Sequence, residues 1–359
     1  MTEHAGNNDA SQVGPEWAGI AAFLGREVEA IDGPVEIVAT GRPLGGASWE
    51  TFFVDYRVDP GATQRVVIRR APATGPMAPY EVAKDAMLFG VLADSDVPVP
   101  RLLAWTEDPN VFERPFLVAS WVAGEAPDLS QVERWPRWKA NRVGLGEEMI
   151  RCLAALQRVR WQETDLASVL GGVGDARTCA RRVVNRYLDP LFGDAKRLDV
   201  GVPVWREIGA WLRDSAPDLS EDELVIVHGD YRFGNLIWQD DEIVAVLDWE
   251  RALLGGPMQD LGFLCMPLSR RRQPEIMGKV LSFDELARSY EKESGRTIDF
   301  VQLQYYAVLW QFLEGVNTTR ALLQERAPMI LSGVLVQPNL IARQTLELID
   351  HVEAGRAIL

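Results

Sequence analysis

The residues from His228 to Asn235 read His-Gly-Asp-Tyr-Arg-Phe-Gly-Asn, and a further carboxylate, Asp248, follows in Val-Leu-Asp-Trp. Transfer of a phosphoryl group requires a carboxylate that accepts a hydroxyl proton, oxygen ligands for magnesium, and a cation near the moving phosphate. In this segment Asp230 is the candidate proton acceptor and Arg232 the candidate cation. Asn235 and Asp248 are the candidate magnesium ligands. The segment therefore indicates phosphoryl transfer to an alcohol.

Three short apolar runs predict the strands that hold these residues. The first run ends at the His-Gly-Asp loop, so the loop is expected at a strand end. The other two runs flank a polar turn and are expected to pair as a hairpin. The runs are Leu224–Val227, Leu236–Trp238 and Ile243–Leu247, and the turn is Gln239–Glu242.

The hairpin predicts where the two candidate metal ligands lie. If it closes around Asp240 and Asp241, Asn235 lies opposite Val246. Asp248 is then the diagonal neighbour of Asn235 on the same face, because side chains alternate along a strand. Diagonal neighbours lie about 7–8 Å apart at the backbone, so both side chains are expected to reach one divalent ion. Each piece alone has ordinary structural explanations, but the combination favours a magnesium site.

These motifs resemble those of the aminoglycoside phosphotransferase and choline kinase family. The resemblance is carried by His228-Gly229-Asp230 with Asn235, by Val246–Glu250 and by Asp260-Leu261-Gly262. It extends from about Leu44 to about Arg320. It implies an α+β, two-lobed fold similar to that of protein kinases, with a small β-rich N-terminal lobe and a larger, mainly helical C-terminal lobe.

The resemblance also implies roles for single residues. Asp230 is expected to be the catalytic base, and Asn235 and Asp248 are expected to hold Mg²⁺. Asp260 is expected to brace the catalytic loop without acting on substrate, and His228 to organise that loop.

Element patterns along the chain agree with a lobe boundary near residue 122. Residues 1–122 are expected to form the nucleotide-binding lobe with a leading helix, and residues 123–359 the helical lobe with the catalytic loop and the acceptor site. Two segments have helical spacing, four read as strands, and the prolines of Val97–Pro100 force an extended connection. The helical segments are Glu16–Glu29 and Ala83–Leu92; the strands are Val35–Ala39, Phe52–Val58, Val66–Ile68 and Phe116–Val122.

A small-residue loop is the first candidate for nucleotide binding. Gly45, Gly46 and Ser48 lie between two predicted strands, where small residues let backbone N–H groups approach phosphate oxygens. The loop lacks the spacing of a P-loop, and an ordinary turn is the alternative. Its place ahead of the second strand matches the phosphate-covering loop of the family.

Arg69 stands where kinase-like proteins carry a strand lysine that binds the α- and β-phosphates. Asp85 occupies the helix position that usually supplies its glutamate partner. We interpret the two as a compensated pair, because arginine is longer than lysine and aspartate shorter than glutamate. The alternative is that both are surface residues, and Arg70 and Glu81 are the nearest competitors. By resemblance, the carbonyl of Ser120 and the N–H of Val122 are expected to bind the purine edge of ATP or GTP.

The acceptor is a small molecule with a hydroxyl group, and its identity is the least predictable feature. Candidate wall segments are Trp135–Trp138, Arg177–Tyr187 and Tyr305–Arg320, including Trp310, Phe312 and Glu314; candidate basic groups are Arg181, Arg182, Arg186 and Arg270–Arg272. One hypothesis is a kinase of hydroxyacyl-CoA thioesters, similar to a branch fused to acyl-CoA dehydrogenases. The other is an aminoglycoside or macrolide kinase. A non-catalytic nucleotide-binding regulatory protein is the alternative from another class.

Composition narrows the remaining possibilities. The chain has 359 residues and a formal net charge of -15, which argues against nucleic-acid binding. No apolar run approaches the roughly 20 residues that span a bilayer, so we expect no membrane partner. The first thirteen residues lack signal-peptide order and the three cysteines are widely spaced, so we expect a cytoplasmic protein. The oligomeric state is not predicted.

Overall fold

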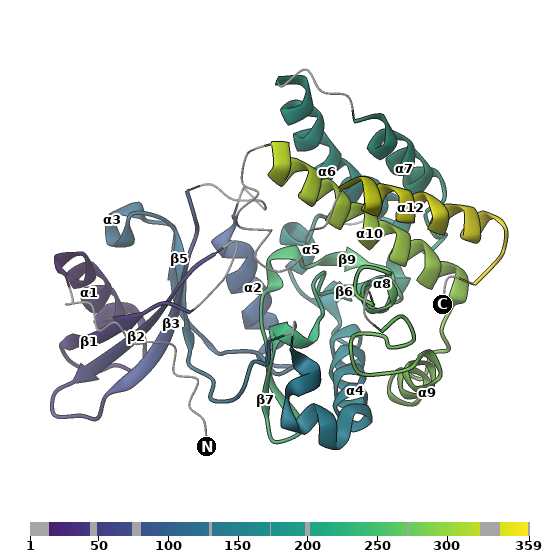
Figure 1. The fold of residues 1–359 in the computed structure, drawn as a ribbon. Coiled ribbons are helices and arrows are strands. Elements are labelled where there is room, and N and C mark those ends of the chain that lie inside the picture. The colour runs from purple at the N-terminus through teal and green to yellow at the C-terminus, as the bar shows by residue number, and fades with distance from the viewer. Residues whose placement is uncertain are drawn as a thin grey trace. The chain divides into compact units, whose positions relative to one another are not determined.

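The computed structural model describes residues 14–43, 49–73, 80–128, 131–172, 174–197, 202–270, 273–323 and 338–357. These residues divide into two units. The first unit contains the described residues up to Asp94 together with Val99–Ala123, and the second contains Ser95–Pro98 and the described residues from Gly124 onward (Figure 1).

The first unit is built on a five-stranded antiparallel sheet in the order β1-β2-β3-β5-β4. Helices α1 and α3 cover one face of this sheet and α2 lies on the other (Figure 1). The strands are β1 (Val35–Gly41), β2 (Glu50–Val58), β3 (Gln64–Arg70), β4 (Leu102–Thr106) and β5 (Phe116–Ser120); the helices are η1 (Pro15–Trp17), α1 (Ala18–Glu27), α2 (Val82–Leu92) and α3 (Pro109–Phe112).

Side chains along β2 alternate between a face buried in the core and the opposite, partly exposed face that includes Thr51. Phe52, Val54 and Tyr56 are buried in the hydrophobic core that α1 covers. Burying a side chain of this size contributes about 1.5–3 kcal/mol each. The residues between them, such as Thr51, point to the other face, and Thr51 pairs with Arg69 of β3. The sheet therefore places Arg69 away from the apolar core.

Strand β4 is absent from the sequence prediction. Its five residues read Leu-Leu-Ala-Trp-Thr, and none of them is fully buried. Because β4 is an edge strand without apolar–polar alternation, periodicity does not mark it. The other predicted strands and helices of this unit are present with bounds shifted by a few residues.

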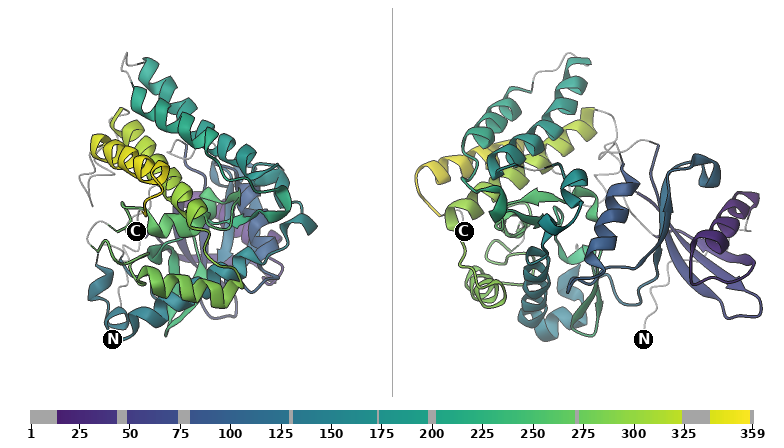
Figure 2. Two further views of the ribbon diagram at one scale, coloured as in Figure 1. Left: turned by 90° about the vertical axis from the view of Figure 1, so that its right-hand side faces the viewer. Right: turned by 180° about the vertical axis from the view of Figure 1, so that it is seen from behind.

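The second unit is mainly helical. Figure 2 shows α6 and α7 side by side, with α10 and α12 packed against them, and α4 packs against α9. The helices are α4 (Pro136–Gln157), α5 (Leu166–Val169), α6 (Ala176–Arg197), α7 (Pro203–Asp214), α8 (Gln259–Cys265), α9 (Phe283–Ser294), α10 (Phe300–Leu323) and α12 (Pro338–Glu353). Short 3-10 turns are η2 (Val132–Arg134), η3 (Trp161–Glu163), η4 (Glu221–Glu223), η5 (Phe233–Asn235) and η6 (Trp249–Arg251).

Two small antiparallel ladders interrupt these helices and frame the candidate catalytic residues. One pairs β6 (Val225–Val227) with β9 (Leu253–Gly255), and the other pairs β7 (Leu236–Gln239) with β8 (Glu242–Val246). Strands β6, β7 and β8 correspond to the three apolar runs predicted from the sequence, whereas β9 was not predicted. In the described ranges, no helix has the length and apolar character required to cross a membrane. The mixed α+β class is confirmed.

Candidate active site

The loop after β6 is held in place by Asp260, at the start of α8. Its Oδ2 accepts the His228 backbone N–H at 2.8 Å, and its Oδ1 accepts the Gly229 N–H at 3.0 Å. Gly229 has φ 82°, and a Cβ there would lie 2.5 Å from the carbonyl oxygen of Arg251, so only glycine fits. With both oxygens engaged and 1% exposure, Asp260 shapes the loop and does not face a substrate.

We expect Asp260→Ala to lower the free energy of unfolding by about 2–6 kcal/mol, because each of two buried N–H groups left without an acceptor costs about 1–3 kcal/mol. Urea unfolding of purified protein measures this loss. Asp222→Ala, at an exposed position just before β6, is the matched control. An Asp260→Ala protein as stable as wild type would contradict the bracing role.

His228 joins this loop to the end of the hairpin. Its Nε2 donates to the carbonyl of Leu247 at 2.9 Å, and its Nδ1 accepts the Asp230 backbone N–H at 3.1 Å. These two bonds fix the neutral tautomer. The imidazole is fully buried, and burial lowers the pKa of His228 to about 4. His228 is therefore a neutral structural bridge near pH 7.

The burial of His228 and Asp260 has opposite effects on the pH dependence of stability. Between pH 6.5 and 4 the unfolded state binds the His228 proton and the folded state does not, so stability falls as pH drops. Burial raises the pKa of Asp260 to about 7, so there the folded state keeps a proton that the unfolded state loses, and stability falls as pH rises.

We therefore expect the pH dependence of stability in His228→Gln to reflect the titration of Asp260 without the opposing effect of His228. As pH rises from 4 to 6.5, the unfolding free energy of the variant should decline relative to that of wild type by up to about 1.4 kcal/mol per pH unit. Urea midpoints at several pH values test this difference. Parallel curves for the two proteins would show that His228 does not resist protonation in the fold.

Asp230 lies at the centre of the loop and is bracketed by two side chains. Asn235 Nδ2 donates to the Asp230 carbonyl at 2.9 Å and to its Oδ2 at 2.8 Å. Arg232 Nε lies 3.0 Å from Oδ1 and 3.1 Å from Oδ2. The Asp230 side chain is 16% exposed, so its carboxylate remains accessible. The structure thus brings together Asp230, Arg232 and Asn235 as the sequence predicts.

Burial and neighbouring charges act on the Asp230 carboxyl in opposite directions. Burial raises its pKa, and the charges of Asp248 and Glu314 raise it further. Arg232 and Arg251 lower it. Burial is the largest of these effects, so the pKa of Asp230 is raised overall despite the two arginines.

The predicted register of the hairpin is wrong by one residue. The turn closes around Asp240 and Asp241 as predicted, with Gln239 opposite Glu242. Val244 then has no partner, because Trp238 pairs with Ile243 and Ile237 with Ala245, so β8 contains a bulge. Leu236, and not Asn235, is opposite Val246. The backbone carbonyl of Asn235 accepts the Leu247 N–H at 2.8 Å. Strand alternation thus does not position Asp248, whose backbone is left-handed with φ 70° and ψ 57°.

Asn235 and Asp248 offer the type of ligand atom, oxygen, and the number of protein ligands, two, with which magnesium is commonly bound. The Asn235 amide nitrogen is directed to Asp230, and among the described residues no donor bonds its Oδ1. The charge of Asp248 acts on both Asp230 and His228. No group of three or more His, Cys, Asp or Glu that could hold a metal lies in the described ranges. Magnesium is commonly bound by one or two protein oxygens with phosphates and waters.

Arg251 is a buried cation near Asp230 that was not predicted from the sequence. Arg251 lies in η6, and its Nη1 is 2.6 Å from Glu314 Oε1 on α10. The side chains of Arg251 and Glu314 are 12% and 26% exposed. The signal in the sequence is its place three residues after Asp248, and its partner is too distant in sequence to be predicted.

Several candidate acceptor contacts have structural roles instead. Trp310 and Phe312 are buried, and Trp310 Nε1 donates to the carbonyl of Gln259. Arg182 donates to the carbonyl of Gly171, and Arg270 to that of Cys265. Arg271 and Arg272 lie outside the described residues. Of the acceptor candidates, Glu314 remains half-buried, and Arg181 and Arg186 are exposed.

The first unit brings together the predicted phosphate-binding pair. Arg69 Nη1 lies 3.9 Å from Asp85 Oδ2, and the two side chains are 15% and 2% exposed. The competitor Arg70 is committed elsewhere, with Nη2 2.6 Å from Glu50 Oε2 and its guanidinium over the ring of Phe112. Gly45, Gly46 and Ser48 lie outside the described residues.

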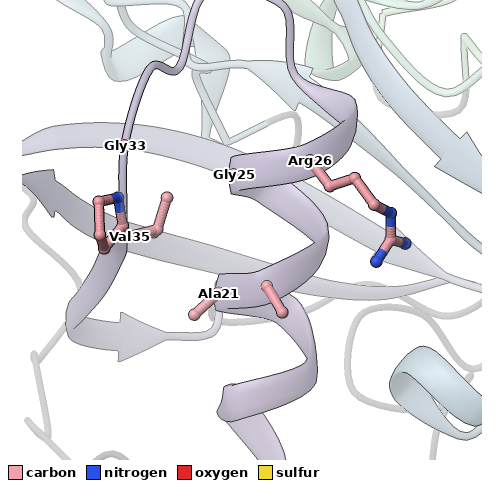
Figure 3. A pocket seen from close by; sticks show the side chains of 7 residues that line it. Ala21, Gly25, Arg26, Gly33 and Val35 are labelled. Atoms are coloured by element: carbon pink, nitrogen blue, oxygen red, sulfur yellow. The ribbon is translucent and has the colours of Figure 1, made fainter.

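The predicted hinge lies at the end of β5. Ser120 is the last residue of the strand, and its Oγ accepts the N–H of Arg101. Val122 follows the strand and is half-buried. Within the described ranges no acceptor takes its N–H. A hollow of about 480 Å³ between α1 and β1 contains none of these residues, and its one charged side chain, Arg26, points away from Val35 (Figure 3).

Comparisons with known proteins agree with this arrangement. The profile of the Phosphotransferase enzyme family matches residues 41–295. Acyl-CoA dehydrogenase family member 11 of Gallus gallus is 30% identical over 284 residues, which are 74% of this chain and 34% of the relative. The chain spans about a fifth to a third of the length of the curated relatives that it matches.

Solved structures show the same fold. A protein of Ralstonia eutropha assigned to the aminoglycoside phosphotransferases superposes with a TM-score of 0.68 and 24% identity, covering 93% of this chain and 98% of the other. An aminoglycoside phosphotransferase in complex with AMP-PNP and hygromycin B has a TM-score of 0.57 and 15% identity, covering 94% and 99%.

The fold and the family profile thus place the chain among phosphotransferases with a kinase-like fold. The chain belongs to the Phosphotransferase enzyme family, as the sequence motifs predict. This membership supports activity toward small molecules.

Proposed function

We propose that this protein is a kinase that transfers the γ-phosphate of ATP or GTP to a hydroxyl group of a small molecule. The observation that carries the proposal is the bracketed carboxylate of Asp230, bonded by Asn235 and Arg232 at the end of the β6 loop. Structural neighbours solved with AMP-PNP or ADP support a nucleotide as the phosphate donor.

In the proposed mechanism Asp230 orients the acceptor hydroxyl and takes its proton as the bond to phosphorus forms. Arg232 offsets negative charge on the group being transferred. Asn235 and Asp248 are the residues that would hold magnesium, which when bound neutralises charge on the phosphates. Catalysis of this kind depends mainly on positioning and electrostatic stabilisation.

The nucleotide would be bound by groups of the first unit. Arg69 carries the charge for the α- and β-phosphates, and Asp85 orients it. The backbone of Ser120 and Val122 would bind the purine edge. The Gly45–Ser48 loop is proposed to cover the phosphates.

For the acceptor we favour the alcohol of a hydroxyacyl-CoA thioester, with aminoglycosides or macrolides as the second class. The matched relatives are acyl-CoA dehydrogenase family members, which supports the first class. Arg181 and Arg186 on α6 are exposed, and Glu314 on α10, which pairs with Arg251, is half-buried; these are the charged groups we propose to contact an acceptor.

Transfer assays with both classes of acceptor test the proposal. Purified protein is incubated with magnesium and ATP or GTP, and products are screened for the mass of one added phosphoryl group. We expect a product with a hydroxyacyl-CoA ester that is absent in Asp230→Ala. Tight nucleotide binding without transfer to any alcohol would instead favour a regulatory nucleotide-binding protein.

A further inference from the structure

Trp49 immediately precedes β2 and lies close to Arg69 of β3. It stands two residues before Thr51, which pairs with Arg69 across β2 and β3. The Arg69 guanidinium carbon lies 5.2 Å from the centroid of the Trp49 ring. The indole and the guanidinium are therefore within the distance of a cation–π interaction.

Two of the side chains that contact Arg69 are Asp85 and Trp49. Asp85 lies at 3.9 Å, which is the outer limit of an ion pair and too long for a hydrogen bond. The indole of Trp49 against the same group restricts the orientation of the guanidinium plane, because planar cations stack on aromatic faces.

Trp49 is buried and packs against neighbouring side chains. It is 7% exposed and makes an edge contact with Tyr80 at 5.5 Å between ring centroids. Its Nε1–H is buried and finds no acceptor in the part of the chain that the structure describes. Its contacts with Arg69 and Tyr80 show that packing against neighbouring side chains holds the ring.

We propose that Trp49 is a positioning residue that holds the Arg69 guanidinium in the orientation required to bind the nucleotide phosphates. The inference rests on the proposed kinase function and explains why arginine occupies the usual lysine position. A lysine ammonium has the same charge but no plane to stack. Arg69 and Trp49 therefore act as one unit.

A double-mutant cycle tests this dependence. Nucleotide affinity is measured by titration calorimetry, with magnesium and ATP, for wild type, Trp49→Met, Arg69→Lys and the double variant. We expect each single change to weaken affinity by about 3–30-fold, and the double variant to be no weaker than the weaker single variant. Trp49→Phe keeps an aromatic face and should lose less affinity than Trp49→Met.

Matched controls separate this effect from general damage. Trp105→Leu alters a tryptophan on β4 that is 43% exposed, and wild-type affinity is expected. Thermal unfolding confirms that each variant is folded. If Trp49→Met does not fold, Arg69→Lys remains decisive, because wild-type affinity in that variant shows that the planar cation is unnecessary.

The outcomes distinguish the inference from the function on which it rests. Wild-type affinity in Trp49→Met, or full multiplication of the two single effects, overturns the positioning role while the kinase proposal stands. Failure of the wild-type protein to bind ATP or GTP overturns the proposed function itself.

Discussion

Replacing Asp230 with alanine is expected to lower kcat by about 10²–10⁴-fold, the usual contribution of a positioned general base. The acceptor hydroxyl would lose the group that orients it and takes its proton. Nucleotide affinity should change little, because the proposed nucleotide contacts of Arg69, Ser120 and Val122 do not involve Asp230. Steady-state kinetics with the acceptor found by screening, together with calorimetric nucleotide titration, measure both quantities.

Two controls make the Asp230 result specific. Asp222→Ala removes an exposed carboxylate a few residues earlier in the chain and should retain wild-type turnover. Asp230→Asn preserves the size of the side chain and should be nearly as inactive as Asp230→Ala. Substantial turnover in either Asp230 variant would refute the assignment of the base.

Removing the charge of Asp248 should impair both metal use and turnover. We expect Asp248→Asn to raise the magnesium concentration for half-maximal activity by at least the roughly 10–100-fold that loss of an outer-shell partner costs. Asparagine is the informative substitution because it tolerates the left-handed backbone at φ 70°. An effect of this variant therefore reports the carboxylate and not backbone strain.

Nucleotide binding with and without metal gives the second measurement for Asp248. Wild-type protein should bind ATP more tightly when magnesium is present, and Asp248→Asn should lose most of that difference. In metal-free buffer the two proteins should have similar affinity. If magnesium strengthens ATP binding equally in both proteins, Asp248 is not a metal ligand.

The contacts within the candidate catalytic loop were predictable because the residues that make them are close together in the sequence. Asp230, Arg232 and Asn235 lie within six residues, and the structure places their side chains in direct contact. The Asp240-Asp241 turn was also predictable from its polar residues between two apolar runs. The bulge at Val244 was not, because an extra residue in a strand leaves no mark in an apolar stretch.

Features that depend on distant contacts escaped prediction. Arg251 pairs with Glu314, which lies 63 residues away on α10. Arg69 and Asp85 were predictable as a pair from their places in a strand and a helix, whereas the proximity of Trp49 to Arg69 depends on how the chain enters β2. Aromatic residues at helical spacing, such as Trp310, gave no indication of which face they occupy.

The imidazole of His228 connects the two chain segments that carry the acidic groups. Since it bonds the amide of Asp230 on one side and the carbonyl preceding Asp248 on the other, neither segment can shift independently. Under the proposed function, we expect adaptation to new alcohols to occur in exposed side chains such as Arg181 and Arg186 of α6, which lie outside this bonded framework. The choice of alcohol could then change without disturbing the residues proposed to carry out transfer.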